Sequence, residues 1–239
     1  MKTVLLTGGT SGVGRATLEI LCESREYFVE FTYANSADIK EHLELKFTNC
    51  RGYFCDFRQQ DSIDTFLGII NSKSYDVLIN NAFVGNFLET NFHKIDCEVF
   101  YKDFTQNIIP VVKITQAVVA NMRKRKSGSI INVLSSAIRN PPLGSASYVG
   151  VKSYLAMLSK SWAKEYARFN ISSNAVLPSM METKMLQSID ERIIDHVKQN
   201  TPDKELLTTH ETAQIIIGIV RSTHKMTGQE LLIDSGNNI

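Results

Sequence analysis

Cysteine, proline and tryptophan are scarce in this chain of 239 residues, which contains four, five and one of them, respectively. The cysteines lack the spacing of metal ligands, and the five histidines form no metal-binding motif. No apolar run approaches the length that crosses a bilayer, and the first strand pattern starts too near Met1 for a signal peptide. A formal net charge of +1 gives no reason to expect a nucleic acid partner. We therefore expect a cytoplasmic protein without a metal, a membrane anchor or a nucleic acid partner.

Strand and helix patterns alternate along the chain, and no low-complexity linker separates them. Short apolar runs predict strands at 2–7, 27–33, 51–55, 76–80, 129–134, 172–177 and 230–234. Helical periodicity predicts helices at 12–24, 37–45, 60–71, 94–124, 146–169 and 209–221, with shorter helical pieces between 182 and 200. This alternation is typical of parallel β-α-β units with helices on both faces of the sheet. The sequence therefore predicts one α/β domain over residues 1–239.

A glycine-rich turn lies between the first predicted strand and the first predicted helix. It reads Thr7-Gly8-Gly9-Thr10-Ser11-Gly12-Val13-Gly14. In this context glycines let the backbone approach a pyrophosphate, which then binds the amides at the helix N-terminus. A lone glycine cluster is more often only a turn, so the flanking strand and helix favour a dinucleotide-binding site.

A second motif places Tyr148 and Lys152 four residues apart within one predicted helix. The lysine ammonium favours the phenolate, so we expect it to lower the pKa of Tyr148 toward the working pH. Ser135, thirteen residues before the tyrosine, follows an apolar strand and can hydrogen-bond the same reacting oxygen. Tyrosine and lysine at this spacing also occur on ordinary surface helices, so the motif gains its weight from the glycine-rich turn.

These motifs together resemble those of the short-chain dehydrogenase/reductases, in register over nearly the whole chain. The family's N-N-A-G appears as Asn80-Asn81-Ala82 followed by Phe83, and its P-G-x-x-x-T runs from Pro178 to Thr183 with Ser179 replacing glycine. The pattern is most similar to that of the 3-oxoacyl-acyl-carrier-protein reductases. The resemblance implies a single-domain Rossmann fold, with a doubly wound parallel sheet of about seven strands. It also implies an NAD(P)H-dependent enzyme that reduces a ketone to an alcohol by hydride transfer.

The resemblance implies a catalytic set of four residues: Asn107, Ser135, Tyr148 and Lys152. In this scheme Tyr148 donates the proton, Ser135 orients the carbonyl, and Lys152 also hydrogen-bonds the nicotinamide ribose. Asn107 holds a water in the proton relay to the lysine. Ser136 is the competing serine, but the family's thirteen-residue spacing to the tyrosine selects Ser135. Pro110 predicts a kink near residue 106 that frees backbone carbonyls for water.

The resemblance also implies which residues bind the cofactor. They are Thr7, Gly8, Thr10, Ser11, Gly12, Val13, Gly14, Tyr33, Asn35, Ser36, Asp56, Phe57, Asn81, Ala82, Tyr148, Lys152, Pro178, Met181 and Thr183. Tyr33 stands where members that prefer NAD carry an acid, so nothing there repels a 2′-phosphate. No lysine or arginine replaces that acid, although Ser11, Asn35 and Ser36 can hydrogen-bond a phosphate. We expect NADPH, with NADH as the alternative.

Two cofactor-site residues have competing interpretations. Asp56 fits the family's adenine contact, but it is also a typical solvated turn aspartate. Phe83 brings a side chain to a place where the family lets bare backbone approach the cofactor, so we expect reshaped or weakened cofactor binding.

The substrate is less closely defined by the sequence. The pocket is expected from 84–87, 137–144 and 180–206, a mostly apolar wall in which 180–206 forms a mobile lid. Arg139 is either a contact for a substrate carboxylate or phosphate, or a solvated loop residue. The basic run 123–126, extended by Arg168, implies docking of an acyl carrier protein, although such cations also offset a helix dipole.

Three function classes stay open at this stage. The first is a reductase of 3-oxoacyl thioesters. The second is a reductase or dehydrogenase for a nucleotide sugar or a secondary-metabolite intermediate, and the third is a non-catalytic dinucleotide-binding relative. The resemblance further implies a homodimer or homotetramer paired through the helices at 94–124 and 146–169. We expect the second of these helices to contribute a broad apolar stripe: Leu155, Leu158, Trp162 and Tyr166.

Overall fold

A computed structural model describes residues 1–85, 90–183, 186, 191–202 and 204–236. Seven strands form one parallel sheet in the order β3-β2-β1-β4-β5-β6-β7. Their bounds are β1 Lys2–Leu6, β2 Tyr27–Tyr33, β3 Cys50–Phe54, β4 Val77–Asn80, β5 Gly128–Val133, β6 Ile171–Pro178 and β7 Glu230–Ile233. β1 pairs with β2 on one side and β4 on the other, so the direction of winding reverses between β1 and β4. The predicted doubly wound parallel sheet is confirmed.

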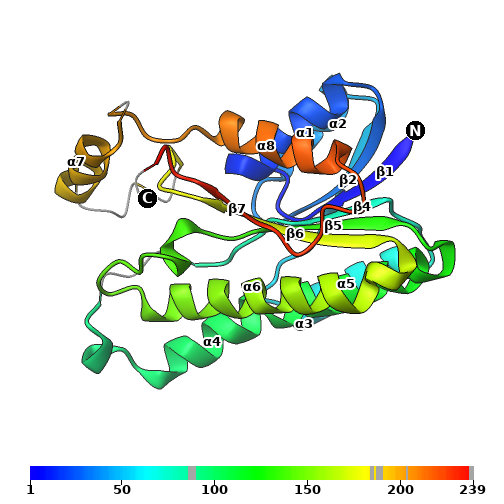
Figure 1. Ribbon diagram of the computed structural model, residues 1–239. Helices are drawn as coiled ribbons and strands as arrows, with labels where there is room; N and C mark the ends of the chain where they lie inside the picture. The colour runs from blue at the N-terminus through cyan, green and yellow to red at the C-terminus, as the bar shows by residue number, and fades with distance from the viewer. Residues whose placement is uncertain (86–89, 184–185, 187–190, 203, 237–239) are drawn as a thin grey trace.

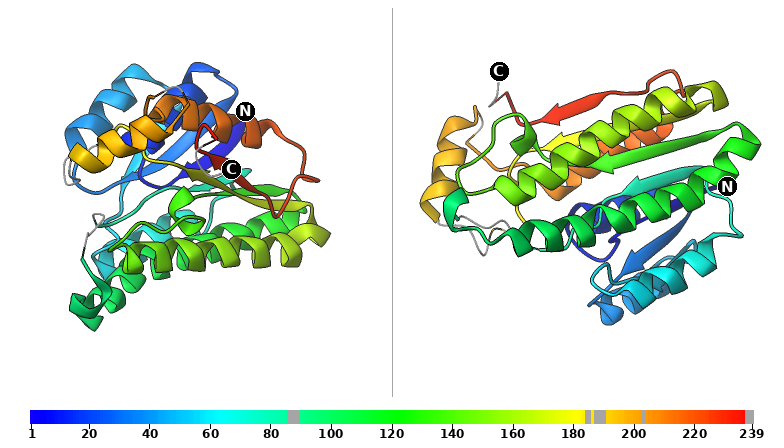
Figure 2. Two further views of the ribbon diagram at one scale, coloured as in Figure 1. Left: turned by 60° about the vertical axis from the view of Figure 1, so that its left-hand side comes forward. Right: turned by 90° about the horizontal axis from the view of Figure 1, so that it is seen from below.

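Helices cover both faces of this sheet (Figures 1 and 2). One layer contains α1 (Gly12–Glu23), α2 (Ala37–Lys46) and α8 (Thr209–Arg221). The opposite layer contains α3 (Gln60–Ile70), α4 (Cys97–Asn107), α5 (Ile109–Arg125) and α6 (Ala146–Tyr166). A further helix, α7 (Glu191–Asn200), lies beyond the carboxyl ends of the strands. Short 3-10 turns at Phe92–Lys94, Ser136–Ile138 and Ala167–Phe169 complete the described elements.

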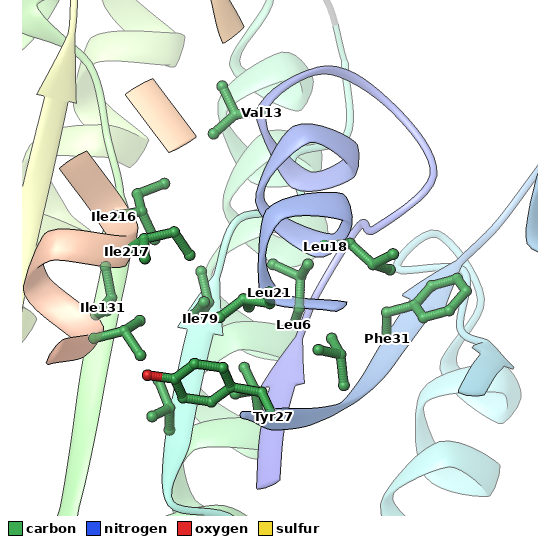
Figure 3. Close-up of a cluster of buried hydrophobic side chains, with 14 of the residues drawn as sticks. Leu6, Val13, Leu18, Leu21, Tyr27, Phe31, Ile79, Ile131, Ile216 and Ile217 are labelled. Carbon is green, nitrogen blue, oxygen red and sulfur yellow. The ribbon is translucent and has the colours of Figure 1, made fainter. Parts of the chain in front are cut away.

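The sheet is buried on both faces, which explains why its strands are almost continuously apolar. Figure 3 shows the core between the sheet and α1 and α8, where Leu6 and Ile79 from the sheet meet Leu21 and Ile216 from the helices. A second cluster fills the space between the sheet and α3, α5 and α6. These two cores fix the strand ends, and therefore the loops that follow them.

The long helix predicted at 94–124 is two helices. α4 ends at Asn107 and α5 begins at Ile109, so the break falls at Ile108 rather than near residue 106. Pro110 sits in the first turn of α5, where its missing N–H costs nothing because those amides have no partner within the helix. Ile108 itself keeps right-handed helical dihedral angles, so the interruption at the proline is a single residue close to the predicted kink.

The apolar stripe predicted on α6 was partly wrong. Leu155 and Trp162 are buried in the core beneath the sheet, whereas Tyr154 and Met157 are exposed on the outer face. Leu158 and Tyr166 pack at the edge of the same core. No helix of the described residues is both long enough and apolar enough to cross a membrane. Within the same residues no group of three or more histidine, cysteine and acidic side chains is placed to hold a metal.

Candidate active site

The glycine-rich turn joins β1 to α1 at the point where the winding of the sheet reverses, which is where such folds bind ligands. Gly12 has a φ of 51°, a conformation that side chains rarely allow. A Cβ on Gly14 would lie 2.1 Å from the Gly8 carbonyl oxygen, so only glycine permits this packing of helix against turn. The bare backbone and the α1 N-terminus therefore fit a dinucleotide pyrophosphate.

Thr7 and Asn81 hold this turn against the end of β4. The Thr7 hydroxyl accepts hydrogen bonds from the backbone N–H groups of Asn81 (2.9 Å) and Ala82 (3.0 Å). The Asn81 amide donates to the carbonyl oxygens of Thr7 (2.9 Å) and Gly8 (3.1 Å). Both side chains are thus engaged in shaping the site, which explains why these residue types follow β1 and β4.

Ser135 and Tyr148 meet beyond the end of β5. Their side chains are hydrogen-bonded to each other, and the Ser135 hydroxyl also accepts from the Ala137 N–H at 3.2 Å. Ser147, the residue before Tyr148 in the first turn of α6, donates to the Asp103 carboxylate of α4 at 2.6 Å, which fixes the start of α6. The structure therefore brings together the serine and tyrosine that the motif spacing selected.

Lys152 is only 5% exposed, and its ammonium donates to the Val133 carbonyl oxygen at 3.0 Å. Burial lowers the pKa of this lysine from 10.5 to about 8. Burial likewise raises the pKa of Tyr148, although its hydrogen bond with Ser135 acts in the opposite direction. The expected lowering of the tyrosine pKa by Lys152 is therefore not found in this structure: desolvation of the phenolate raises the pKa, and only the hydrogen bond with Ser135 opposes it.

Phe83 contacts both members of this pair. Its ring packs edge-on against Tyr148, with centroids 5.2 Å apart and planes at 79°. The Lys152 Nζ lies 4.8 Å from the centroid of the Phe83 ring and 5.9 Å from that of Tyr148. The side chain that stands in place of the family's glycine thus lies against both Tyr148 and Lys152.

Asn107 is 1% exposed, and its side chain clamps the backbone of Val84. Its Oδ1 accepts from the Val84 N–H at 2.7 Å, while its amide donates to the carbonyl oxygens of Val84 and Asp103, both at 3.0 Å. Both amide hydrogens are used in these bonds. A water in a relay must therefore bind through an oxygen acceptor of this residue and not through its amide hydrogens.

A guanidinium that the sequence reasoning missed lies at the expected adenosine end of the site. Arg58 binds both oxygens of the buried Asp56 carboxylate, at 2.9 and 2.8 Å, and its Nη2 donates to Asn35 Oδ1 at 3.0 Å. This pairing holds the pKa of Asp56 below its usual range. Tyr33 packs edge-on against Phe54 with ring centroids 6.0 Å apart. The sequence feature that could have indicated Arg58 is its position two residues after Asp56, because the loop after β3 brings it close to Asn35, which follows β2.

The remaining predicted cofactor residues differ in what they can offer. The side chains of Val13 and Phe57 are buried in the two cores, so only their backbone atoms can reach a ligand. Thr183 lies beside Gly12, since a Cβ on that glycine would approach its Cγ2 at 3.9 Å. Ser11 is exposed and precedes α1, whereas Ser36 is half-buried and precedes α2; neither side chain makes a capping hydrogen bond. Three further predicted residues lie near the carboxyl ends of the strands. Thr10 is buried in the glycine-rich turn, Pro178 is the last residue of β6, and Met181 forms a β-bridge with Leu207.

The expected substrate wall is only partly described. Arg139, the cation expected near the substrate, binds the Glu230 carboxylate, which also binds Lys160 at 2.8 Å. Arg139 is therefore held toward Glu230 by an ion pair, and 52% of its side chain stays exposed. Phe87 and Met185, which the sequence placed in the wall, lie outside the described residues.

Comparison with known proteins agrees with this geometry. The family model for short chain dehydrogenases matches residues 2–193. The 3-oxoacyl-(acyl-carrier-protein) reductase of Thermotoga maritima is 29% identical over 98% of this chain and 97% of its own length. The acetoacetyl-CoA reductase of Shinella zoogloeoides is 27% identical over 90% and 89%. A solved 3-oxoacyl-(acyl-carrier protein) reductase from Brucella melitensis has the same fold, with a TM-score of 0.87 at 22% identity over 100% of this chain and 91% of that one.

The chain belongs to the short-chain dehydrogenase family, whose members are NAD(P)-dependent oxidoreductases. The motif positions, the strand order and the family match therefore lead to the same class of enzyme.

Proposed function

We propose that this protein is an NADPH-dependent reductase of 3-oxoacyl thioesters. The observation that carries the proposal is the cluster of Ser135, Tyr148 and Lys152, placed at the same sheet edge as a glycine turn built for a pyrophosphate. A bound nicotinamide would supply the hydride. The side chains of the protein would orient the substrate carbonyl, donate the proton to its oxygen and stabilise the charge that develops there.

Tyr148 is the proposed proton donor to the substrate oxygen. Because burial raises its pKa, the phenol is fully protonated at neutral pH in the unliganded enzyme and ready to donate. Ser135 is hydrogen-bonded to the phenol and orients the same carbonyl oxygen as a preorganised donor. Lys152 replenishes the proton, since a pKa of about 8 lets it exchange protons near neutrality. Asn107 completes the proposed relay by holding a water through an oxygen acceptor, while its side chain also fixes the Val84 backbone.

NADPH is favoured over NADH because of Arg58. The absence of an acid at Tyr33 already removes the group that would repel a 2′-phosphate. Arg58 adds a guanidinium at Asn35, which is one of the residues proposed to bind that phosphate. The pairing of Arg58 with Asp56 leaves part of the guanidinium exposed, since 45% of the arginine side chain is accessible. Arginine binds phosphate well through its planar fork of N–H groups.

A 3-oxoacyl thioester is the proposed substrate because relatives at 29% and 27% identity are named as reductases of 3-oxoacyl-acyl-carrier-protein and acetoacetyl-CoA. An acidic carrier protein would dock on the basic surface formed by the end of α5 and Arg168. There, the guanidiniums of Arg123 and Arg168 lie 5.0 and 4.8 Å from the centroid of the Phe169 ring. Arg125 is instead paired with Asp76 at 2.8 Å.

We also propose that the protein is a homo-oligomer, a dimer or tetramer, paired through α4 and α6. Exposed apolar side chains gather on these adjacent helices: Tyr101, Phe104, Tyr154 and Met157. Phe104 and Tyr154 pack against each other across the two helices, with ring centroids 5.2 Å apart. A patch of this kind on a soluble monomer would be unusual. Segment 180–206, which includes α7 beyond the strand ends, is the proposed cover of the substrate.

The test is oxidation of NADPH and, separately, of NADH with a short 3-oxoacyl thioester, by the wild type and by Tyr148→Phe. We expect turnover with NADPH that falls by at least about a hundredfold in the variant, since a positioned acid contributes roughly that much. Phenylalanine keeps the ring packing, so dinucleotide binding should be retained. Dinucleotide binding without turnover of the thioester would reject the proposed substrate and lead to sugars and other ketones. Failure to bind either dinucleotide would reject the enzyme assignment itself.

A further inference from the structure

The ring of Phe83 covers part of Tyr148 and Lys152, the two residues proposed to contact the ligand. It lies edge-to-face with Tyr148 and has the Lys152 ammonium 4.8 Å from its centroid. Phe83 has a negative φ, so it is not a strained residue held in place by its backbone. Its side chain is partly buried against the core beneath the sheet. The ring position is therefore set by packing and by its two catalytic neighbours.

The Lys152 ammonium depends on this ring. An ammonium carries three N–H donors, and the described hydrogen bonds use one of them, to the Val133 carbonyl. Within the described residues no carboxylate contributes to the shift in its pKa, which burial alone explains. An aromatic face attracts a cation, and the attraction is stronger where water is excluded. Phe83 thus supplies part of the stabilisation that a buried charge needs.

The same contact has a consequence for binding. A ligand hydroxyl or carbonyl that accepts a hydrogen bond from Lys152 has to come within about 3 Å of Nζ. The Phe83 ring faces that atom, so the ligand and the ring compete for one side of the ammonium. The ring lies next to Gly85, since a Cβ built on that glycine would be 3.8 Å from the Phe83 Cε1, so a ring that leaves the ammonium has to move relative to this glycine.

We propose that Phe83 is an aromatic gate that covers Lys152 and Tyr148 in the unliganded enzyme and is displaced when a nicotinamide nucleotide binds. The inference rests on the proposed function, because it takes the ligand of Lys152 to be that nucleotide. Part of the intrinsic affinity is spent on displacing the ring, which lowers the observed affinity. Phe83 is in this sense a positioning residue: it acts on the reaction through the tyrosine and the lysine.

The first test compares NADPH and NADH binding by the wild type, Phe83→Ala, Phe83→Leu and a control, Phe92→Ala. Phe92 forms a similar edge-on pair with Phe100, at 6.1 Å and 71°, and lies outside the cluster. We expect Phe83→Ala to bind dinucleotide about tenfold more tightly than the wild type, equivalent to about 1.4 kcal/mol. Phe83→Leu, which keeps bulk but has no ring to hold the cation, should gain less, and Phe92→Ala should not change.

The second test needs no ligand. Lys152 in the unliganded proteins is acylated with acetic anhydride, and the extent at that residue is followed by mass spectrometry. A covering ring predicts faster acylation in Phe83→Ala than in the wild type, whereas a purely structural role predicts no difference in a folded variant. Circular dichroism establishes that each variant is folded, and Phe83→Leu serves if Phe83→Ala is not.

The outcomes separate the two hypotheses. Equal or weaker dinucleotide binding by both folded Phe83 variants, with binding by the wild type intact, overturns the gate and leaves the proposed function standing. An unchanged acylation rate at Lys152 overturns the gate as well. No binding of either dinucleotide by any of the proteins overturns the proposed function, and the gate with it.

Discussion

Replacing Lys152 with methionine should stabilise the unliganded fold while abolishing activity. Burial lowers the pKa of this lysine from 10.5 to about 8. Each pKa unit is worth about 1.4 kcal/mol, so this lowering corresponds to a penalty of roughly 3 kcal/mol for keeping the charged form folded. Methionine has a similar length and needs no water or counter-charge. Loss of the hydrogen bond to Val133 costs about 1 kcal/mol, which leaves a net gain of about 2 kcal/mol.

The dependence on pH distinguishes this cause from better packing. Below pH 8 the lysine is charged in both the folded and unfolded chains, so the whole penalty is present. Between about pH 8 and 10.5 the folded chain carries fewer protons than the unfolded chain, so the stability of the wild type rises with pH. Above 10.5 both forms are neutral and the penalty is absent. The advantage of Lys152→Met should therefore be greatest near neutrality and should shrink as pH increases.

Urea unfolding without dinucleotide, at one fixed subunit concentration, measures this difference at about pH 7 and about pH 10. Other titrating groups cancel when the variant is subtracted from the wild type, and Tyr148 does not interfere because burial raises its pKa. Lys164→Met, at an exposed position of the same helix, is the matched control and should give no such difference. A less stable Lys152→Met at neutral pH, or an advantage that does not change with pH, would refute the reasoning.

Two further predictions concern the coenzyme and the assembly. Arg58→Ala should weaken NADPH binding about tenfold with little effect on NADH, because a charged hydrogen bond to the 2′-phosphate is lost. Titration of the protein with each nucleotide measures the two affinities, and equal losses of affinity would argue against a phosphate contact. Met157→Glu should lower the oligomeric state, because it places a charge on the exposed face of α6. Sedimentation velocity measures the mass of the assembly, with Glu23→Gln at an exposed position of α1 as the control. An unchanged mass would argue against pairing through this face of α6.

The parts of the fold that could be predicted are those that depend on the pattern of neighbouring residues in the sequence. The buried parallel strands read as short apolar runs, and Tyr148 and Lys152 share a helical face, so their spacing alone places them together. Pro110 indicated the interruption of the helix but did not fix its place at Ile108, because a proline is compatible both with a kink and with the first turn of a helix. The inward direction of Leu155 and Trp162 depends on how α6 rotates onto the sheet, which an apolar stripe does not specify.

The parts that could not be predicted are contacts between distant segments. Arg58 reaches Asn35 from another loop, 23 residues away, so no search at the end of the second strand could find it. The pKa values of Tyr148 and Lys152 also depend on burial, which the motif does not contain. From spacing alone the lysine is a charge that acidifies the tyrosine. In the folded chain both groups are desolvated, and each is shifted toward its neutral form.

The shifted pKa values of Tyr148 and Lys152 explain why an aromatic ring at position 83 is compatible with this site. A buried ammonium needs partners, and a carboxylate beside Lys152 would fix its charge and oppose proton transfer. A backbone carbonyl and an aromatic face stabilise the charge less strongly, so the lysine keeps a pKa of about 8 and can exchange protons near neutrality. Neither partner is a carboxylate, so neither fixes the charge of the lysine permanently. A glycine at this position would have no side chain to cover the lysine, whereas Phe83 covers it until a ligand takes over the contact.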